Sequence, residues 1–242
     1  MTYHYRDAAG LVASIEKWLI ERVREAGASG GIVGLSGGID SAVVAALLKR
    51  AFGQSMLAVS LPCGSSKSDS DDAVLTAKAL DLPFVEIDLT PVYNSFLNAV
   101  GGTLSPIAAA NIKPRLRMTT LYALAQNRSF LVCGTDNKAE RMIGYFTKHG
   151  DGGCDLLPIG DLLKREVRIL AEHLGIPDRV IVKAPSAGLW EGQTDEEEMG
   201  LNYEQIDAYF SSGEVEEEAA ARISRMVSSS EHKRTLPPVC IP

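Results

Sequence analysis

The sequence predicts an α/β protein: a doubly wound, open parallel sheet with helices on both faces, followed by C-terminal helices. Three observations lead to this fold class. Short apolar runs typical of buried strands alternate with segments of helical periodicity up to about residue 133. A glycine-rich turn follows the first run, at the edge where sheets of this kind bind ligands. Beyond residue 145 the alternation stops, and long polar loops separate the helices.

The first half of the chain alternates between helix and strand. Residues 11–26 carry apolar side chains at helical spacing, which predicts an amphipathic helix. Apolar runs over 31–35 and 56–61 predict the first two strands, and Pro62 ends the second. The other elements of this half are predicted, in chain order, as helix 41–52, helix 71–80, strand 84–89, helix 92–100, helix 106–127 and strand 129–133.

The second half is predicted to consist of polar loops and separate helices. The Gly- and Asp-rich loop over 145–158 and the polar loop over 184–200 are of the kind that carries function. In the second loop, Thr194 and Glu197 match the pattern of a capping box, which starts a helix. Helices are predicted over 160–174, 203–211 and 214–228.

Composition and charge exclude several function classes. The chain has 242 residues and a net charge of −7, whereas a nucleic-acid binder with a broad basic face would lean the other way. Its four cysteines contain no C-x-x-C pair, which argues against a zinc or iron–sulfur site. The N-terminus lacks the apolar segment of a secretory signal peptide, and no apolar run is long enough to span a membrane. We therefore expect one cytoplasmic domain over residues 1–242, with no nucleic-acid or membrane partner.

The most informative motif is the run 36–41, with the sequence Ser-Gly-Gly-Ile-Asp-Ser. Adjacent glycines let the backbone pass close to an anion, and the N–H groups that start the next helix favour negative charge. Ser36 and Ser41 add hydroxyl donors, and Asp40 offers a hard oxygen ligand for Mg²⁺. The run lacks the Gly-Lys-Ser/Thr of a Walker motif. It predicts a pyrophosphate-binding turn with its own metal ligand, and a plain glycine-rich turn is the alternative.

This run resembles the signature of the ATP-pyrophosphatase group, whose members cleave ATP between the α and β phosphates. Further segments resemble the ammonia-dependent NAD synthetase family, in that family's order and spacing: 111–118, 134–140, 144–152, 158–162, 185–196 and 232–233. The resemblance implies the Rossmann-like fold of the adenine nucleotide alpha-hydrolases. It also implies a carbon–nitrogen ligase with two steps. ATP adenylates the nicotinate carboxylate of deamido-NAD, and ammonia then expels AMP to give NAD.

The resemblance assigns residues to ATP and to Mg²⁺. Mg²⁺ is expected between Asp40 and Glu140, and Lys164 is expected to stabilise the charge of the departing pyrophosphate. From the residues alone, Glu140 could be a solvated helix carboxylate, Lys164 an exposed lysine and Ser186 a plain turn serine. The expected ATP-binding residues are Gly34, Leu35, Ser36, Gly37, Gly38, Ile39, Asp40, Ser41, Thr135, Lys164 and Ser186.

A second group of residues is matched to deamido-NAD, whose pyrophosphate and carboxylate suit cationic side chains. Asp151 or Asp155 could act as the base that takes a proton from ammonium. The expected catalytic residues are Asp40, Lys164 and, as this base, Asp155. Arg117 could equally brace the fold, and the adenine contacts expected in the loop 61–72 stay unassigned. The residues expected to bind deamido-NAD are Asn111, Arg115, Lys148, Asp155, His232 and Lys233.

The resemblance also bears on assembly and on competing functions. It implies a homodimer with deamido-NAD at the interface, and helix 106–127 is the candidate contact. We expect no glutaminase domain, because 242 residues leave no room for one, so ammonia comes free or from a partner. Another adenylating ligase or thiolase, and a nucleotide-binding regulator without catalysis, are the alternatives. The absence of a poised cysteine argues against a sulfur-transfer enzyme, and the presence of Asp40, Glu140 and Lys164 argues against the regulator.

Overall fold

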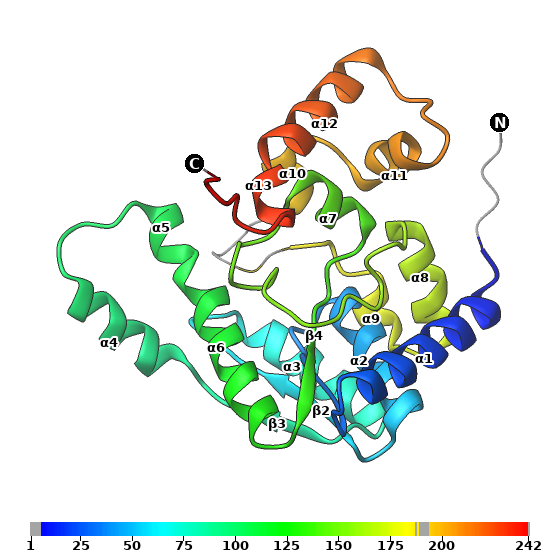
Figure 1. The fold of residues 1–242 in the computed structure, drawn as a ribbon, viewed down its shortest axis with the longest axis vertical. Helices are drawn as coiled ribbons and strands as arrows, with labels where there is room; N and C mark the ends of the chain where they lie inside the picture. The colour runs from blue at the N-terminus through cyan, green and yellow to red at the C-terminus, as the bar shows by residue number, and fades with distance from the viewer. Residues whose placement is uncertain (1–5, 187, 189–193, 242) are drawn as a thin grey trace.

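A four-stranded parallel sheet lies at the centre of the computed structural model, which describes residues 6–186, 188 and 194–241 (Figure 1). The strand order is β3-β2-β1-β4, and the register pairs Gly31 with both Met56 and Leu131. The order reverses between β1 and β4, so a ligand is expected beyond the carboxyl ends of these two strands. The strands are β1 (Gly30–Gly34), β2 (Met56–Ser60), β3 (Phe84–Glu86) and β4 (Phe130–Cys133).

Helices cover both faces of this sheet, as the apolar runs of the sequence require. One face packs against α1 (Ala8–Glu25), α2 (Ile39–Phe52), α3 (Lys67–Ala79) and α8 (Lys164–His173). The other face packs against α6 (Ile112–Gln126). Helix α2 is buried along almost its whole length because it lies between β1 and the outer helices α1 and α8. That position explains why its sequence is apolar on every side. The predicted doubly wound sheet is confirmed.

The C-terminal helices form a third apolar cluster above the carboxyl end of the sheet (Figure 1). Its members include Ile143, Tyr203, Ile206 and Ile223, which are all buried. This cluster brings the C-terminal helices against the helix that follows β4. The elements involved are α7 (Lys138–Ile143), α10 (Asp195–Met199), α11 (Tyr203–Ser211) and α12 (Glu217–Ser229), and the short helix α13 (Glu231–Arg234) follows α12.

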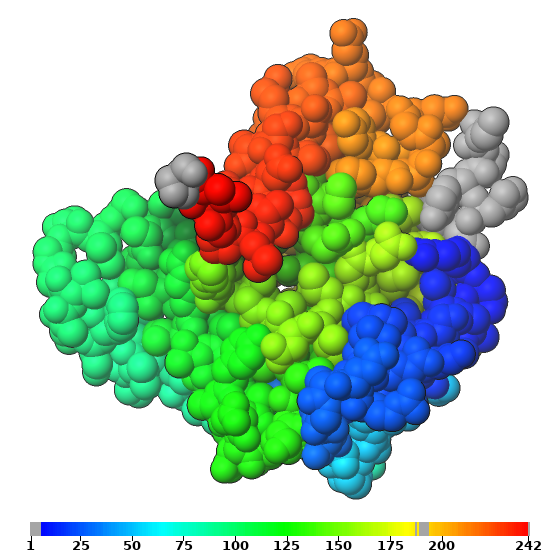
Figure 2. All heavy atoms as spheres, viewed as in Figure 1, coloured from blue at the N-terminus to red at the C-terminus, as the bar shows by residue number. Residues whose placement is uncertain are grey.

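Helices α4 (Thr90–Val100) and α5 (Pro106–Ala110) extend away from the sheet (Figure 1). In Figure 2 this segment forms a lobe at the edge of the molecule. Helix α4 buries none of its residues and leaves Val92 and Phe96 50% and 43% exposed. The lobe therefore offers an apolar surface that the rest of the described chain does not cover.

Several sequence-based predictions differ from the structure. Helix α3 begins at Lys67 rather than at residue 71, and strand β3 ends at Glu86 rather than at residue 89. The predicted helix 106–127 is two helices, α5 and α6, with a turn at Asn111. Pro114 explains the break, because its ring would clash with the carbonyl of Ala110 in a continuous helix. Helix α8 begins at Lys164 rather than at residue 160. Thr194 starts α10, but its side chain makes no capping hydrogen bond, so the predicted capping box there is wrong.

The short helices α7, α9 (Asp178–Ile181) and α13 were not given separate ranges by the sequence pattern. Each has at most six residues, which is too short for helical periodicity to be visible. Among the described residues, no helix combines the length and the apolar character needed to cross a membrane.

Candidate active site

The candidate site is a cavity of about 690 Å³ at the carboxyl ends of β1 and β4. Its walls come from the turn after β1, the segment after β4, the start of α6, the loop 144–151 and residues 183–186. Gly37 and Asp155 are the predicted site residues that do not line it. Those that do are Gly34, Leu35, Ser36, Gly38, Ile39, Asp40, Ser41, Asn111, Arg115, Thr135, Glu140, Lys148, Lys164, Ser186, His232 and Lys233.

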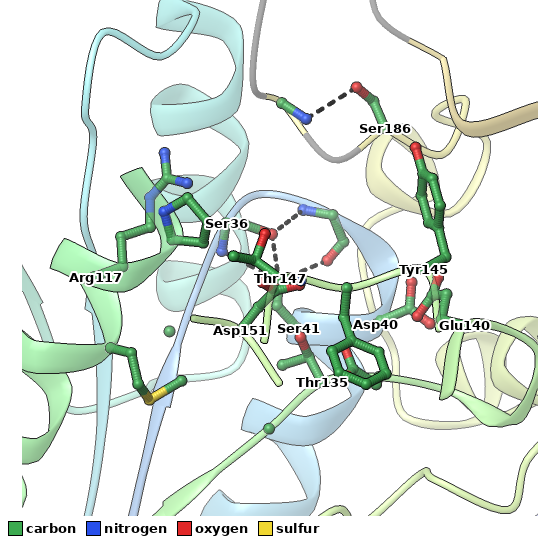
Figure 3. Close-up of a pocket in the computed structure, with 18 of the residues that line it drawn as sticks. Ser36, Asp40, Ser41, Arg117, Thr135, Glu140, Tyr145, Thr147, Asp151 and Ser186 are labelled. Atoms are coloured by element: carbon green, nitrogen blue, oxygen red, sulfur yellow. Dashed lines mark hydrogen bonds between the residues drawn. The ribbon is translucent and has the colours of Figure 1, made fainter. Parts of the chain in front are cut away.

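The turn between β1 and α2 has the geometry of an anion-binding loop. The Ser36 N–H donates to Ser41 Oγ at 3.2 Å, and the Ser41 hydroxyl donates to the Gly38 carbonyl at 2.9 Å. The two hydroxyls lie 3.1 Å apart and face the cavity (Figure 3). Gly38 caps α2 without any side-chain hydrogen bond, so the first N–H groups of the helix are available to an anion.

Gly37 is required in this turn for two reasons. Its φ is +83°, a conformation that side-chain-bearing residues rarely adopt. A Cβ atom at this position would also lie 2.3 Å from the Asp69 carbonyl oxygen of α3. Gly37 therefore shapes the turn from behind, although it does not line the cavity.

Lys164 connects the two carboxylates that the sequence assigned to a metal. Its ammonium lies 2.6 Å from Asp40 Oδ2 and 3.2 Å from Glu140 Oε1, and its side chain is 2% exposed. Burial alone would lower the pKa of Lys164, but the two carboxylates raise it, so the lysine stays charged. Burial raises the pKa of Glu140 to about 7, although Lys164 opposes that shift. Such a buried charge is stable only because it is paired.

Asn137 holds the other oxygens of the same two carboxylates. Its side-chain amide donates to Asp40 Oδ1 at 3.0 Å, and its backbone N–H donates to Glu140 Oε2 at 3.1 Å. The Glu140 N–H returns a bond to Asn137 Oδ1 at 3.1 Å, which completes a capping box at the start of α7. Asn137 is fully buried. The carboxylates of Asp40 and Glu140 are thus oriented before any ligand arrives.

The donor set suits a divalent cation. Asp40 Oδ2 and Glu140 Oε1 both lie within hydrogen-bond distance of the Lys164 ammonium. Two hard oxygens therefore converge on one cationic position beside the turn between β1 and α2, which we call the phosphate turn. Mg²⁺ prefers one or two carboxylates together with phosphate oxygens and water. No cluster of three or more candidate metal-ligating side chains occurs in the described part of the chain. The remaining ligands would therefore come from the nucleotide and from solvent.

Five of the six residues expected to bind deamido-NAD line the cavity around the loop 144–151, and Asp155 does not line it. Arg115 donates to the Lys148 carbonyl at 3.2 Å, and Thr147 Oγ1 donates to Asn111 Oδ1 at 2.8 Å. The Lys148 ammonium donates to the backbone carbonyl of His232. These bonds join the start of α6, the loop 144–151 and α13, which lie far apart in the sequence. The structure thus places Asn111, Arg115, Lys148 and His232 close together, and their role in binding deamido-NAD stays a prediction.

Lys233 supports this part of the cavity from the C-terminal side. Its ammonium donates to the carbonyls of Gly144 at 2.7 Å and Phe146 at 2.8 Å, and it lies 5.3 Å from the centre of the Phe146 ring. Burial lowers the pKa of Lys233, although Asp151 opposes the shift. Lys233 therefore holds the loop 144–151 in place as well as lining the cavity.

Asp155 is separated from the other predicted catalytic residues. Its carboxylate accepts from the Val132 N–H at 2.8 Å and from the Tyr122 hydroxyl at 3.0 Å, outside the cavity. Asp151 does line the cavity, and burial raises the pKa of its carboxyl group. Of the two residues considered as a base for ammonium, Asp151 is therefore the better placed in a single chain. The role of Asp155 stays a prediction.

Arg117 braces the loop in which the adenine contacts were expected. Its guanidinium donates to the Leu61 carbonyl at 3.0 Å and to Ser65 Oγ at 3.1 Å. The sequence did not decide whether Arg117 binds a ligand or braces the fold. In the structure it braces the loop after β2 and also lines the cavity.

Lys183 is a cavity residue that the sequence analysis missed. Its ammonium donates to Asp69 Oδ1 and Asp72 Oδ2, each at 2.7 Å, and to the Gly37 carbonyl at 3.4 Å. It thus joins α3, the phosphate turn and the segment that carries Ser186. Within the motif 185–196, Ala187 and residues 189–193 lie outside the described residues.

Comparison with known proteins decides the family. The sequence model of the NAD synthase family matches residues 11–237. The chain belongs to the NAD synthase family. The NAD synthase match includes the phosphate turn, both carboxylates of the cation position and the His232–Lys233 end of the cavity. The family resemblance inferred from the motifs is confirmed.

Individual members and structures agree with this assignment. An NH(3)-dependent NAD(+) synthetase from Carboxydothermus hydrogenoformans is 52% identical over 226 residues, which cover 92% of this chain and 93% of that protein. The structure of NMN synthetase from Francisella tularensis matches with a TM-score of 0.93 and 38% identity, covering 97% and 99% of the two chains. NH3-dependent NAD synthetase from Campylobacter jejuni, in complex with nitrate, matches with a TM-score of 0.83 and 27% identity, covering 98% and 100%.

Proposed function

We propose that this protein is an ammonia-dependent NAD synthetase, a carbon–nitrogen ligase that amidates deamido-NAD at the expense of ATP. The observation that carries the proposal is the cluster of Asp40, Glu140 and Lys164 beside an open phosphate turn. Membership of the NAD synthase family supports the same activity. The products would be NAD, AMP and pyrophosphate, with a deamido-NAD adenylate as the intermediate.

In the first step, the phosphate turn would hold the β and γ phosphates of ATP. The N–H groups that start α2 and the hydroxyls of Ser36 and Ser41 would donate to phosphate oxygens. The nicotinate carboxylate attacks the α-phosphorus, and the bond to the pyrophosphate oxygen breaks. No base is needed, because this carboxylate is already ionised. Lys164 would stabilise the charge that builds on the departing pyrophosphate. Thr135 and Ser186, which line the cavity, would complete the ATP site.

In the second step, ammonia attacks the carbonyl carbon of the adenylate and AMP leaves. The solution form of ammonia near neutral pH is ammonium, so one proton must be removed before attack. Asp151 is suited to this because it lines the cavity and burial raises the pKa of its carboxyl group. The cavity walls would exclude bulk water from the adenylate and so limit its hydrolysis.

Asp40 and Glu140 are proposed to hold Mg²⁺, because their oxygens converge on one cationic position. When bound, the metal would neutralise phosphate charge and orient the pyrophosphate as a leaving group. Asn137 would fix both carboxylates for that purpose, since it binds the oxygen of each that does not face Lys164.

We further propose that the protein is a cytoplasmic homodimer with deamido-NAD bound at its interface. Phe96 and Ile107 are 43% and 59% exposed on the lobe formed by α4 and α5, and Tyr122 is 39% exposed on α6. An apolar surface of this kind favours association between proteins. Asp155 accepts from the Tyr122 hydroxyl, so in such a dimer it would lie beside the interface. That position would reconcile its predicted role with its place outside the cavity of one chain.

A second candidate function differs only in the acceptor. The high TM-score with the structure of NMN synthetase from Francisella tularensis favours nicotinate mononucleotide as an alternative substrate. Its reacting carboxylate is the same, and it lacks only the AMP half of deamido-NAD. A different adenylating ligase of the ATP-pyrophosphatase group is the broader alternative.

One assay tests the proposed reaction and its alternative acceptors. Purified protein is incubated with ATP, Mg²⁺ and ammonium, and with either deamido-NAD or nicotinate mononucleotide, and the products are separated by chromatography. NAD together with AMP is the expected result. NMN with AMP, and no NAD, would favour the second candidate. AMP without either amide would indicate another acceptor, and no AMP at any pH would overturn the enzyme assignment.

A further inference from the structure

Tyr203 lies behind the cavity and touches three groups of the proposed site. It is the first residue of α11, it is 3% exposed, and it does not line the cavity. Its hydroxyl lies 2.9 Å from Glu140 Oε1 and 3.0 Å from Asp195 Oδ2. Its ring lies 4.5 Å from the Lys164 ammonium. No motif pointed to this tyrosine, which the fold brings to the site from 63 residues beyond Glu140.

The hydroxyl of Tyr203 contacts the carboxylate oxygen of Glu140 that faces the cation position. Glu140 Oε2 is taken by the Asn137 N–H of the capping box. Oε1 is the oxygen that faces Lys164, and Tyr203 reaches this same oxygen from the C-terminal helices. A hydrogen bond to a carboxylate is stronger than one between neutral groups, and it fixes the rotation of the carboxylate plane. Asn137 and Tyr203 therefore each contact a different oxygen of the Glu140 carboxylate and together fix its orientation.

The second partner of Tyr203 extends the contact to two further residues that line the cavity, Asp195 and Tyr145. Asp195 begins α10 and is 5% exposed, and its Oδ1 accepts from the Tyr145 hydroxyl at 3.2 Å. Asp195 and Tyr145 both line the cavity, and Figure 3 shows Tyr145 on the same side as Glu140. The one proton of the Tyr203 hydroxyl is shared between Glu140 Oε1 and Asp195 Oδ2, so the tyrosine connects these two carboxylates, and Tyr145 donates to the other oxygen of Asp195.

We propose that Tyr203 is a positioning residue whose hydroxyl holds Glu140 in the orientation that shares a cation with Asp40. Through Asp195 it also ties that carboxylate to the C-terminal wall of the cavity. The inference rests on the proposed ATP and Mg²⁺ site. Its action is indirect, because Tyr203 itself reaches neither the cavity nor a substrate.

Tyr203→Phe isolates the hydroxyl from the rest of the side chain. The phenyl ring keeps the volume that packs in the C-terminal apolar cluster, and it keeps the face that lies against Lys164. Glu140 retains its bonds to Asn137 and Lys164, and Asp195 retains its bond to Tyr145. We expect a folded protein with an intact cavity, which circular dichroism and thermal unfolding will verify.

The test measures how much Mg²⁺ strengthens the binding of a non-hydrolysable ATP analogue. Calorimetric titration gives the Kd with Mg²⁺ and with EDTA, and the ratio of the two is the metal-dependent gain. In Tyr203→Phe the gain is expected to fall about tenfold, the size of one hydrogen bond to a charged group. The Kd in EDTA is expected to stay within about twofold of the unmodified protein. A purely structural role would instead weaken both values.

Two further variants make the test specific. Tyr209 lies on the same helix, outside the cavity, with its ring 5.1 Å from that of Phe210. Tyr209→Phe is therefore the matched control and should leave the gain unchanged. In a Glu140→Gln background, Tyr203→Phe should cause no further loss, because the two residues act as one unit. An unchanged gain in Tyr203→Phe, or the same tenfold loss in the Glu140→Gln background, would overturn the proposal.

This readout separates the inference from the proposed reaction. The titration involves only the ATP analogue and Mg²⁺, and neither deamido-NAD nor ammonia is present. If the gain falls as expected but no NAD is formed in the assay above, the proposed reaction fails and the positioning role stands. If NAD is formed and the gain is unchanged, only the positioning role fails.

Discussion

Two parts of the cavity are built in different ways. We call the part with Asp40, Glu140 and Lys164 the phosphate end, and the part with Arg115, Lys148 and His232 the dinucleotide end. At the phosphate end, Asp40, Glu140 and Lys164 bind one another, and Lys164 is 2% exposed. At the dinucleotide end, Arg115 and His232 are exposed, and the cations reach backbone carbonyls rather than carboxylates. At the phosphate end two carboxylates therefore share one ammonium, and the chain itself orders all three groups. At the dinucleotide end, backbone carbonyls hold Arg115 and Lys148 without cancelling their charge.

This difference shows what orients the charged side chains at each end of the cavity. Groups that stabilise a transition state are most effective when they are oriented in advance, and the phosphate end meets that condition. Cations that bind the pyrophosphate of a substrate can be ordered by the substrate itself. If a second copy of the chain covers the dinucleotide end, its order would depend on association as well. Variants at the two ends should therefore fail in different ways.

The largest effect is expected from Asp40→Asn at the phosphate end. The amide keeps the shape of the side chain but removes the negative charge that faces Lys164 and the proposed Mg²⁺. AMP release should fall by roughly 10³-fold or more, because charge stabilisation at the reacting phosphates is lost. Circular dichroism should show an intact fold. Turnover at the level of the unmodified protein would remove Asp40 from the metal site.

Lys164→Met should be nearly as damaging to turnover, and it should also lower stability. Loss of the ammonium is expected to cost about 10²- to 10³-fold in kcat. It also leaves two mostly buried carboxylates facing each other, a change that typically costs about 3–5 kcal/mol in the free energy of unfolding. Thermal unfolding should show that Mg²⁺ recovers part of this loss. Arg168→Met, on the exposed side of the same helix, is the control and should change neither quantity.

Phe96→Glu should affect only the dinucleotide end. A charge in the apolar lobe is expected to prevent association, so sedimentation at micromolar concentration should show a monomer. The KM for deamido-NAD should rise roughly tenfold, while the Kd of the ATP analogue stays unchanged, because one chain builds the phosphate end alone. A monomer already present in the unmodified protein would contradict the proposed dimer.

Lys183→Met is expected to have the smallest effect, confined to ATP. The variant loses the bonds that join α3, the phosphate turn and the segment of Ser186. The KM for ATP should rise about fivefold with little change in the KM for deamido-NAD, since only nucleotide binding is loosened. Lys78→Met, an exposed lysine on α3, serves as the control. Equal changes in both KM values would show that Lys183 supports the whole cavity instead.

The sequence was sufficient for features encoded locally. The strand, turn and helix around Ser36–Ser41 follow from adjacent residues, and the structure places them as predicted. The Asn137 interaction could also have been found, because Asn followed three residues later by Glu is a capping-box pattern. Pro114 indicated that a helix begins near it, and α6 does begin two residues earlier, but the pattern did not show that residues 106–110 form a separate helix.

Residues that act across the fold could not be found in this way. Tyr203 and Lys183 reach the site from helices and loops whose position depends on packing of the whole chain. Asp155 shows the reverse case: it lies beside the end of β4, next to the residue that bridges to Cys133, yet its carboxylate turns toward Tyr122 and Val132. Sequence spacing places a residue near a sheet edge, but it does not determine which side of that edge the side chain faces.

Asp40 and Glu140 are proposed to converge on one cation position beside the phosphate turn. A crystal structure with Mn²⁺ and a non-hydrolysable ATP analogue tests this proposal directly, because Mn²⁺ is located by its anomalous scattering. We expect one Mn²⁺ ion bound by both carboxylates and by phosphate oxygens, with the Lys164 ammonium moved onto the phosphates. Mn²⁺ bound elsewhere, with Lys164 still between Asp40 and Glu140, would contradict the account.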